Sequence, residues 1–239
     1  MTNTPLNWKA DHLRVSLFSA QVFQEPVEQI YANFFGAEAI EINQKPATGE
    51  SIASGIYEEL KTEVRRSFNR VDIILQPETL FSLEASLIDD IYSNIEALKK
   101  LTLNFIETRE DLIRIAIGGN YLYEVASPTE GYKKLSEMTR QNFDYGKHKD
   151  VVFQINFPTP SKSIQGISIN RLTHWACPFL TINHVSEAPE SKTHFYCGCL
   201  ADINTHSEDK AVINNQFFIP LLNELASEML ASIRNGVSL

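Results

Sequence analysis

The sequence lacks the features that most directly assign a protein to a class. Only three cysteines occur among 239 residues, Cys177, Cys197 and Cys199, and this small odd number does not form a disulfide framework. No apolar run approaches the ~20 residues that a membrane span needs. The polar first ten residues lack the apolar segment of a signal peptide. We therefore expect a soluble, reduced, cytoplasmic protein that makes no membrane contact.

Catalytic signatures are also missing. The chain contains no Gly-Lys-Ser/Thr of a phosphate-binding loop, no Gly-x-Ser-x-Gly and no His-Glu-x-x-His. Gly118-Gly119 lacks the third glycine of a dinucleotide-binding fingerprint. These absences favour a protein without enzymatic activity, although many enzymes assemble their sites from scattered residues. We expect neither a metal nor a cofactor.

Positive charge is in short supply as well. Lys and Arg number 21 against 30 Asp and Glu, so the formal net charge is -9. An acidic surface repels phosphate backbones, and nucleic acid is therefore an unlikely partner. The hydrophobic content of 43% is ordinary for a globular chain. At this length, folding buries about 70% of the unfolded surface, so the core needs no disulfide or metal to stabilise it.

Apolar periodicity predicts about four helices and several strands. Helices are expected where apolar residues recur at helical spacing, over 27–35, 86–104, from Ser127 onward and over 215–234. Ser127 and Glu130 form a capping box around Pro128. Alternating residues predict a strand near 13–17 and four C-terminal strands, at about 151–158, 166–175, 179–185 and 194–203.

Three further segments carry local signals. Residues 44–55 are polar and indicate a loop, whereas 62–75 indicate one long strand closed by Pro77. Gly118-Gly119-Asn120 lies between two short apolar runs and predicts a tight hairpin turn.

The order of these elements predicts an α+β fold with mainly antiparallel sheets. We expect the C-terminal four-strand run to pack on the long C-terminal helix. A soft boundary near 106–111 would divide the chain into halves 1–108 and 109–239, unless both form a single compact domain. No sequence repeat relates the halves.

Two clusters are candidate ligand sites. Asp202, His206 and Asp209 could converge on a cation or form an acid/base pair, or they could belong to an ordinary polar loop. Arg66 and Arg70 would share one strand face and could clamp an anion. The competing interpretation of this second cluster is an exposed face on which neighbouring charges neutralise one another.

A third cluster is more easily explained by packing. His194, Cys197 and Cys199 lie close together, as zinc ligands do. On a strand, however, residues two apart share a face, so Cys197 and Cys199 point the same way as Phe195 and Ala201. We expect both thiols to be buried in the core.

These observations favour a non-catalytic binding or regulatory protein that acts through protein contacts, such as an inhibitor, an immunity protein or an accessory subunit. The alternative is a small-molecule-binding protein or enzyme with a pocket between the C-terminal sheet and the 215–234 helix. Asp202 and His206 would then supply polar groups, with Arg66 or Arg70 as the anion clamp. Nucleic-acid binding through Arg65 and its neighbours is a third hypothesis. A homodimer is compatible with each of these.

Overall fold

A computed structural model describes residues 7–79, 82–107, 109–184, 190–206, 213 and 215–237. Its strands are β1 (Trp8–Ser19), β2 (Glu41–Lys45), β3 (Glu50–Tyr57), β4 (Leu60–Ser67), β5 (Arg70–Pro77), β6 (Leu112–Val125), β7 (Val152–Asn156), β8 (Thr159–Pro160), β9 (Ser168–Ala176), β10 (Phe179–His184) and β11 (Glu190–Thr205). Its helices are α1 (Val27–Phe35), α2 (Ile91–Ile106), α3 (Pro128–Thr139) and α4 (Phe218–Asn235), with a 3-10 turn η1 (Asn215–Phe217) before α4.

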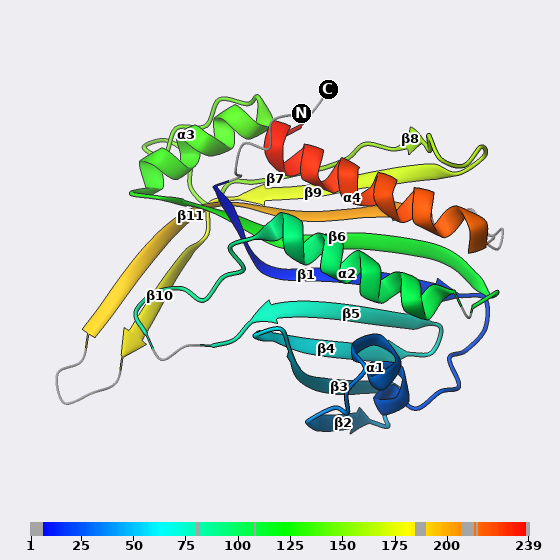
Figure 1. The fold of residues 1–239 in the computed structure, drawn as a ribbon. Coiled ribbons are helices and arrows are strands. Elements are labelled where there is room, and N and C mark those ends of the chain that lie inside the picture. The colour runs from blue at the N-terminus through cyan, green and yellow to red at the C-terminus, as the bar shows by residue number, and fades with distance from the viewer. Residues whose placement is uncertain are drawn as a thin grey trace.

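All eleven strands belong to one antiparallel sheet, with the order β2-β3-β4-β5-β1-β6-β11-β9-β7. Strand β8 pairs with β9, and β10 pairs with β11 to form a ribbon that leaves the body of the sheet (Figure 1). The α+β class, the antiparallel sheet, the four helices and the packing of α4 on the C-terminal strands are confirmed.

The two halves of the sheet repeat one topology. In each half a strand is followed by a helix, a run of antiparallel strands and a second helix. In each half the last strand of the run pairs beside the first, β5 beside β1 and β11 beside β6. The first strands, β1 and β6, pair antiparallel with each other at the junction, as two-fold related halves would. The repeat is visible in the order of the elements, but the two halves share no recognisable sequence similarity.

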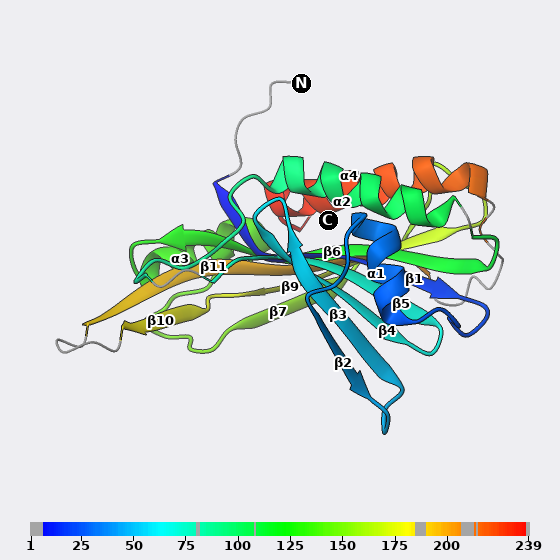
Figure 2. The same ribbon diagram turned by 60° about the horizontal axis from the view of Figure 1, so that its bottom comes forward.

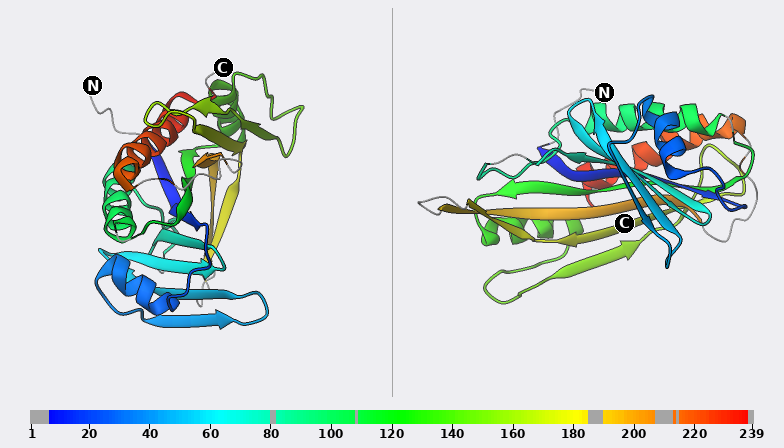
Figure 3. Two further views of the ribbon diagram at one scale, coloured as in Figure 1. Left: turned by 90° about the vertical axis from the view of Figure 1, so that its right-hand side faces the viewer. Right: turned by 90° about the horizontal axis from the view of Figure 1, so that it is seen from below.

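All four helices cover the same face of the sheet. Residues that pair directly across neighbouring strands lie on the same face of a sheet. One such row crosses β4, β5, β1 and β6 at Thr62, Leu75, Leu13 and Gly119. On that side α1 reaches Thr62 through the Tyr31 hydroxyl at 2.7 Å, and α2 packs on β1 and against α4. Tyr121 and Tyr123, two and four residues beyond Gly119 on β6, contact α4 and α3. Figures 2 and 3 show α2 and α4 side by side on this face of the sheet.

Three local predictions were wrong. Residues 44–55 form most of the β2–β3 hairpin rather than a loop, and 62–75 form two strands, β4 and β5, because the chain turns at Phe68-Asn69. Phe68 takes a positive φ of 26° at that turn, which the apolar pattern did not indicate.

The third error concerns Gly118 and Gly119, which make no turn. They lie inside the continuous strand β6. A Cβ atom at Gly118 would lie 2.4 Å from the carbonyl oxygen of Ala201, and one at Gly119 would lie 2.5 Å from that of His12. The glycines therefore permit close approach of the two neighbouring strands rather than positive backbone angles.

The end of α1 and the start of α3 follow the sequence closely, whereas α2 begins at Ile91 rather than near residue 86. Gly36 ends α1 in the left-handed conformation with a φ of 66°. The Ser127 side chain accepts a hydrogen bond from the backbone N–H of Glu130 at 3.3 Å, and the Glu130 carboxylate accepts one from Ala126 at 3.0 Å, which confirms the predicted cap of α3. No helix in the described part of the chain is long and apolar enough to cross a membrane.

Candidate functional site

The face of the sheet opposite the helices, here called the open face, carries a cluster of arginines at its centre. Strand alternation places Arg14, Ser16 and Phe18 of β1 on the open face and their neighbours in the core. Within the described ranges, no helix covers this face. Its side chains are therefore available to a partner.

Two guanidinium groups share one aromatic ring on the open face. Arg70 and Arg114 lie 5.2 and 4.7 Å from the ring centroid of Phe18, within the range of cation–π attraction. The Nε of Arg70 donates to Asp72 at 2.9 Å. Within the described part of the chain, Arg114 donates only to the neutral side chain of Asn204, at 3.0 Å, and its buried Nε has no hydrogen-bond partner there.

A second set of contacts crosses the sheet from Asp202. Arg14 on β1 donates to the Asp202 carboxylate at 2.9 Å, although β6 lies between their strands. The residue of β6 in register with both is Gly118, which has no side chain to block the contact. The Asn204 amide donates to the same carboxylate at 2.7 Å. The absence of a side chain at Gly118 thus permits both the close approach of β11 to β6 and the ion pair between Arg14 and Asp202.

An amide row extends the set toward the sheet edge. Asn170 on β9 donates to the Asn204 oxygen at 3.2 Å, and Asn156 on β7 donates to the Asn170 oxygen at 3.1 Å. Asn204 therefore accepts from both Asn170 and Arg114. Three asparagines and two arginines are held in fixed orientations, which lowers the entropy cost of binding a partner.

Electrostatics single out Arg114. Burial lowers the pKa of its guanidinium, and the like charge of Arg70 lowers the pKa further, while the charge of Asp202 acts in the opposite direction. No carboxylate among the residues that the structure describes lies within ion-pair distance of Arg114. Among the residues that the structure describes, the open face thus holds a partly buried positive charge without a direct counter-ion.

Among the predicted site residues that the structure describes, Arg66 is not brought together with Asp202 and Arg70. Asp202 and Arg70 lie on the open face. Arg66 points to the opposite side, where it donates to the backbone carbonyl of Glu25 at 3.0 Å, because the turn after Ser67 separates it from Arg70. His206 follows β11, its backbone N–H donating to the Ser168 carbonyl at 2.8 Å, and Asp209 lies outside the described residues.

Sequence reasoning missed Arg14, Arg114 and Asn204. Arg114 lies in an apolar run that was recognised, and Asn204 lies one residue beyond the strand predicted at 194–203. Alternation alone places both opposite the core residues Ile115 and Ile203. Their convergence could not be predicted, because it depends on the pairing of β6 with β11, about 90 residues later in the chain. Arg65 also lies on the open face and is paired with Glu63.

An apolar hollow lies beside α3. A pocket of about 720 Å³ separates α3 and the segment 145–152 from the β10–β11 ribbon. Its walls carry aromatic rings with a lysine and a thiol, namely Tyr132, Tyr145, Phe179, Phe195, Lys149 and Cys177. By contrast, the pocket between β7, β9 and α4, where the sequence placed its alternative site, has only about 40 Å³.

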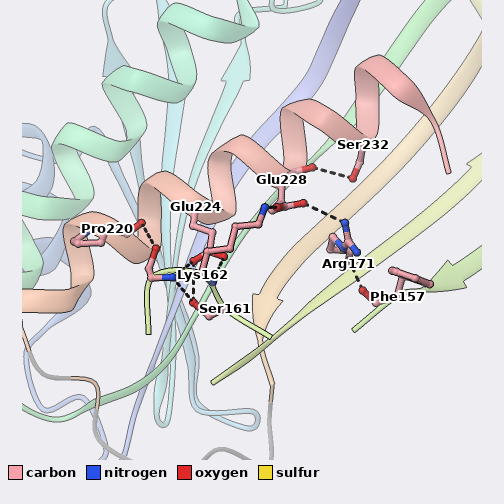
Figure 4. A network of polar contacts seen from close by, with 9 residues as sticks. Phe157, Ser161, Lys162, Arg171, Pro220, Glu224, Glu228 and Ser232 are labelled. Carbon is pink, nitrogen blue, oxygen red and sulfur yellow. Dashed lines mark hydrogen bonds and ion pairs between the residues drawn. The ribbon is translucent and has the colours of Figure 1, made fainter. Parts of the chain in front are cut away.

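Charged groups beside α4 are all engaged in holding a loop. The Glu224 carboxylate accepts hydrogen bonds from the backbone N–H groups of Lys162 at 2.7 Å and Ser163 at 3.0 Å (Figure 4). Glu228 pairs with the Lys162 ammonium at 2.7 Å and with Arg171 at 3.2 Å. This network fastens residues 161–163 to α4.

The thiols lie where alternation predicted. Cys197 and Cys199 are fully buried in the core and Cys177 is half-buried, and all three are free of disulfides. In the described ranges, no three His, Cys, Asp or Glu side chains gather as a metal site would require.

Comparison with known proteins gives no further guide to function. No protein-family model, no curated protein and no solved structure matches the chain.

Proposed function

We propose that the protein is a non-catalytic, cytoplasmic binding protein that docks a partner protein on the open face. The partner presents a carboxylate to Arg114 and hydrogen-bonding groups to Asn170 and Asn156, while the buried Asn204 holds Arg114 in place. Arginines held in fixed orientation at the centre of a surface are typical of residues that dominate binding energy. This assigns an inhibitory, immunity or accessory role in which association itself is the function.

The charge of Arg114, which has no counter-ion among the described residues, carries the proposal. A partly buried guanidinium without a counter-ion loses hydration and gains no ion pair in return. A partner carboxylate would supply that pair and could bind bidentately. The centre of the open face favours an anionic group, because it holds one more guanidinium group than carboxylates, although the whole chain has a charge of -9. The four guanidinium groups belong to Arg14, Arg65, Arg70 and Arg114, and the three carboxylates to Glu63, Asp72 and Asp202.

Exposed apolar side chains add to the same face. Leu200 on β11 is 46% exposed and lies in register between Asn120 and His174. An apolar side chain among polar ones matches the composition of protein interfaces.

The test is affinity capture from the native host, followed by cross-linking and native mass spectrometry. We compare wild type with Arg114→Glu and Leu200→Glu on the open face. The matched control, Lys133→Glu, makes the same charge change at an exposed site on α3. We expect wild type and Lys133→Glu to retain a polypeptide that cross-links to Lys61 on β4, and each open-face variant to weaken its binding at least about tenfold.

Three results would overturn this proposal. One is a partner that binds all four proteins equally. Another is a captured nucleic acid whose affinity falls steeply with salt, which would replace the partner class. The third is an added small-molecule mass with no added chain.

That third result would favour the second candidate function, small-molecule binding. Its support is the pocket beside α3, whose volume of about 720 Å³ and ring-lined walls suit a small ligand. The Lys149 ammonium lies 3.3 Å from the ring centroid of Tyr145 at this pocket. A ligand with an apolar body and an acidic group would match both features.

A further inference from the structure

Cys177 and Cys197 face each other across two antiparallel strands. Ala176 pairs with Gly198 and Phe179 with Phe195, so the register places Cys177 directly opposite Cys197. The adjacent pair is hydrogen-bonded, with the Tyr196 N–H donating to the Pro178 carbonyl at 3.0 Å. The cysteine pair is therefore of the non-hydrogen-bonded kind, in which Cα atoms lie about 4.5 Å apart. That spacing falls within the range that a disulfide requires.

The two thiols differ in access. Cys177 is half-buried and lines the pocket beside α3, whereas Cys197 is fully buried behind it. A reagent that enters the pocket meets Cys177 first.

The first turn of α3 lies against the Cys177 sulfur. A Cβ atom added at Gly131 would lie 3.4 Å from Sγ, so this glycine lets the helix approach the thiol closely. The positive end of a helix dipole favours a thiolate there.

Hydrogen bonding divides the roles of the pair. The Cys197 thiol donates to Cys177, which lowers the pKa of Cys177 and raises the pKa of Cys197. An accessible thiol of lowered pKa backed by a second, protonated thiol is the arrangement that thiol–disulfide exchange uses, because one sulfur attacks and the other resolves.

We propose that Cys177 and Cys197 form a thiol–disulfide exchange site whose substrate is a small disulfide admitted through the pocket. The Cys177 thiolate attacks one sulfur of the small disulfide, whose S–S bond breaks and releases one thiolate. Cys197 then gives its proton to that thiolate and attacks the Cys177 sulfur, which displaces the second small thiolate. The proton originally held by Cys177 is returned to this second thiolate by the solvent. The two protein thiols are oxidised to one disulfide, and the small disulfide is reduced to two thiols.

Glutathione disulfide is the probe for this site. The reduced full-length protein is incubated with it at neutral pH, quenched in acid and examined by intact mass and peptide mapping. We expect wild type to lose two hydrogen atoms and to yield a linked Cys177–Cys197 peptide pair. Cys197→Ser should stop at the mixed disulfide on Cys177, and Cys177→Ser should stay unmodified.

Cys199 provides the matched control. It lies on β11 two residues from Cys197, is equally buried, and is paired with Trp175 rather than with a cysteine. Cys199→Ser should therefore react as wild type does. In the native wild-type protein, iodoacetamide should label Cys177 faster than Cys199, and the two rates should converge in urea.

Several outcomes would overturn the proposal. These are a wild-type mixed disulfide that never closes, an adduct on Cys199 in place of Cys177, or no reaction in the native protein together with reaction in urea. The peptide map of wild type decides the matter even if a serine variant fails to fold. None of these results depends on whether the open face binds a partner.

Discussion

At the scale of single residues, His194 has an unusual environment. Its side chain is buried, yet Nδ1 lies 2.8 Å from the Glu124 carboxylate and Nε2 lies 2.9 Å from the Leu83 carbonyl. Both ring nitrogens therefore face acceptors, and only the protonated imidazolium can donate to both. The hydrogen bond to Glu124 raises the pKa of His194, and the bond to Leu83 raises it further, while burial opposes them.

This arrangement predicts a pH-dependent stability. The pKa of His194 is higher in the folded than in the unfolded protein, so protonated His194 stabilises the fold. This stabilisation is fully present below the unfolded pKa of about 6.5 and is lost as pH rises through the folded pKa. We expect the melting temperature of wild type to fall over that window more than that of His194→Gln. His174→Gln keeps the His194 contacts and should retain the wild-type profile. A wild-type profile that His194→Gln reproduces would refute this role.

Single-residue predictions from sequence succeeded where strand alternation decides. Cys197 and Cys199 face the core, as their spacing requires. Alternation fails at Arg66, because the chain turns at Phe68-Asn69 and a single strand does not continue to Arg70. Arg66 and Arg70 therefore lie on opposite faces of the sheet. One misplaced turn therefore divided a predicted anion clamp between two sides of the sheet.

At the scale of elements, β6 shows why glycine is ambiguous in sequence. Gly-Gly-Asn between apolar runs is typical of a hairpin, but close strand approach requires glycine as well. The helices were easier to predict, because caps and apolar stripes are local signals: Ser127 and Glu130 determine the start of α3 without reference to any distant residue.

Gly118 is the position on β6 where an added side chain would meet a neighbouring strand most closely. Gly118→Ala places a methyl group 2.4 Å from the Ala201 carbonyl oxygen, a backbone atom that cannot rotate away. We expect a loss of about 1–3 kcal/mol in the free energy of unfolding, measured with urea.

Gly146→Ala is the matched control for this measurement. Its added methyl group meets only the Asp144 carboxylate, the end of a side chain rather than backbone, at 3.1 Å. Its effect should stay within about 0.5 kcal/mol. Equal stability of both variants would show that β6 and β11 can separate at no cost, contrary to the role assigned to Gly118.

At the scale of the whole molecule, one sheet joins what the sequence divided at residue 108. Strands β1 and β6 pair over eleven residue pairs, and α2 packs against α4 above them. Side chains also cross the boundary, as the Trp8 and Trp175 rings do with centroids 6.1 Å apart. Such contacts join residues more than a hundred positions apart, and neither composition nor periodicity records them. The open face exists only because both halves contribute to it.

This shared core predicts that the halves unfold together. Independent domains would give two thermal transitions, and each would respond only to mutations in its own half. Leu75 on β5 and Leu222 on α4 are both fully buried, one in each half, so Leu75→Ala and Leu222→Ala should each cost about 2–5 kcal/mol. In differential scanning calorimetry we expect one peak, whose calorimetric and van't Hoff enthalpies agree, and each variant should shift that whole peak downward. If either variant instead splits the peak and leaves one part at the wild-type temperature, residues 1–108 and 109–239 are separate folding units, and the open face is then a surface assembled from two domains.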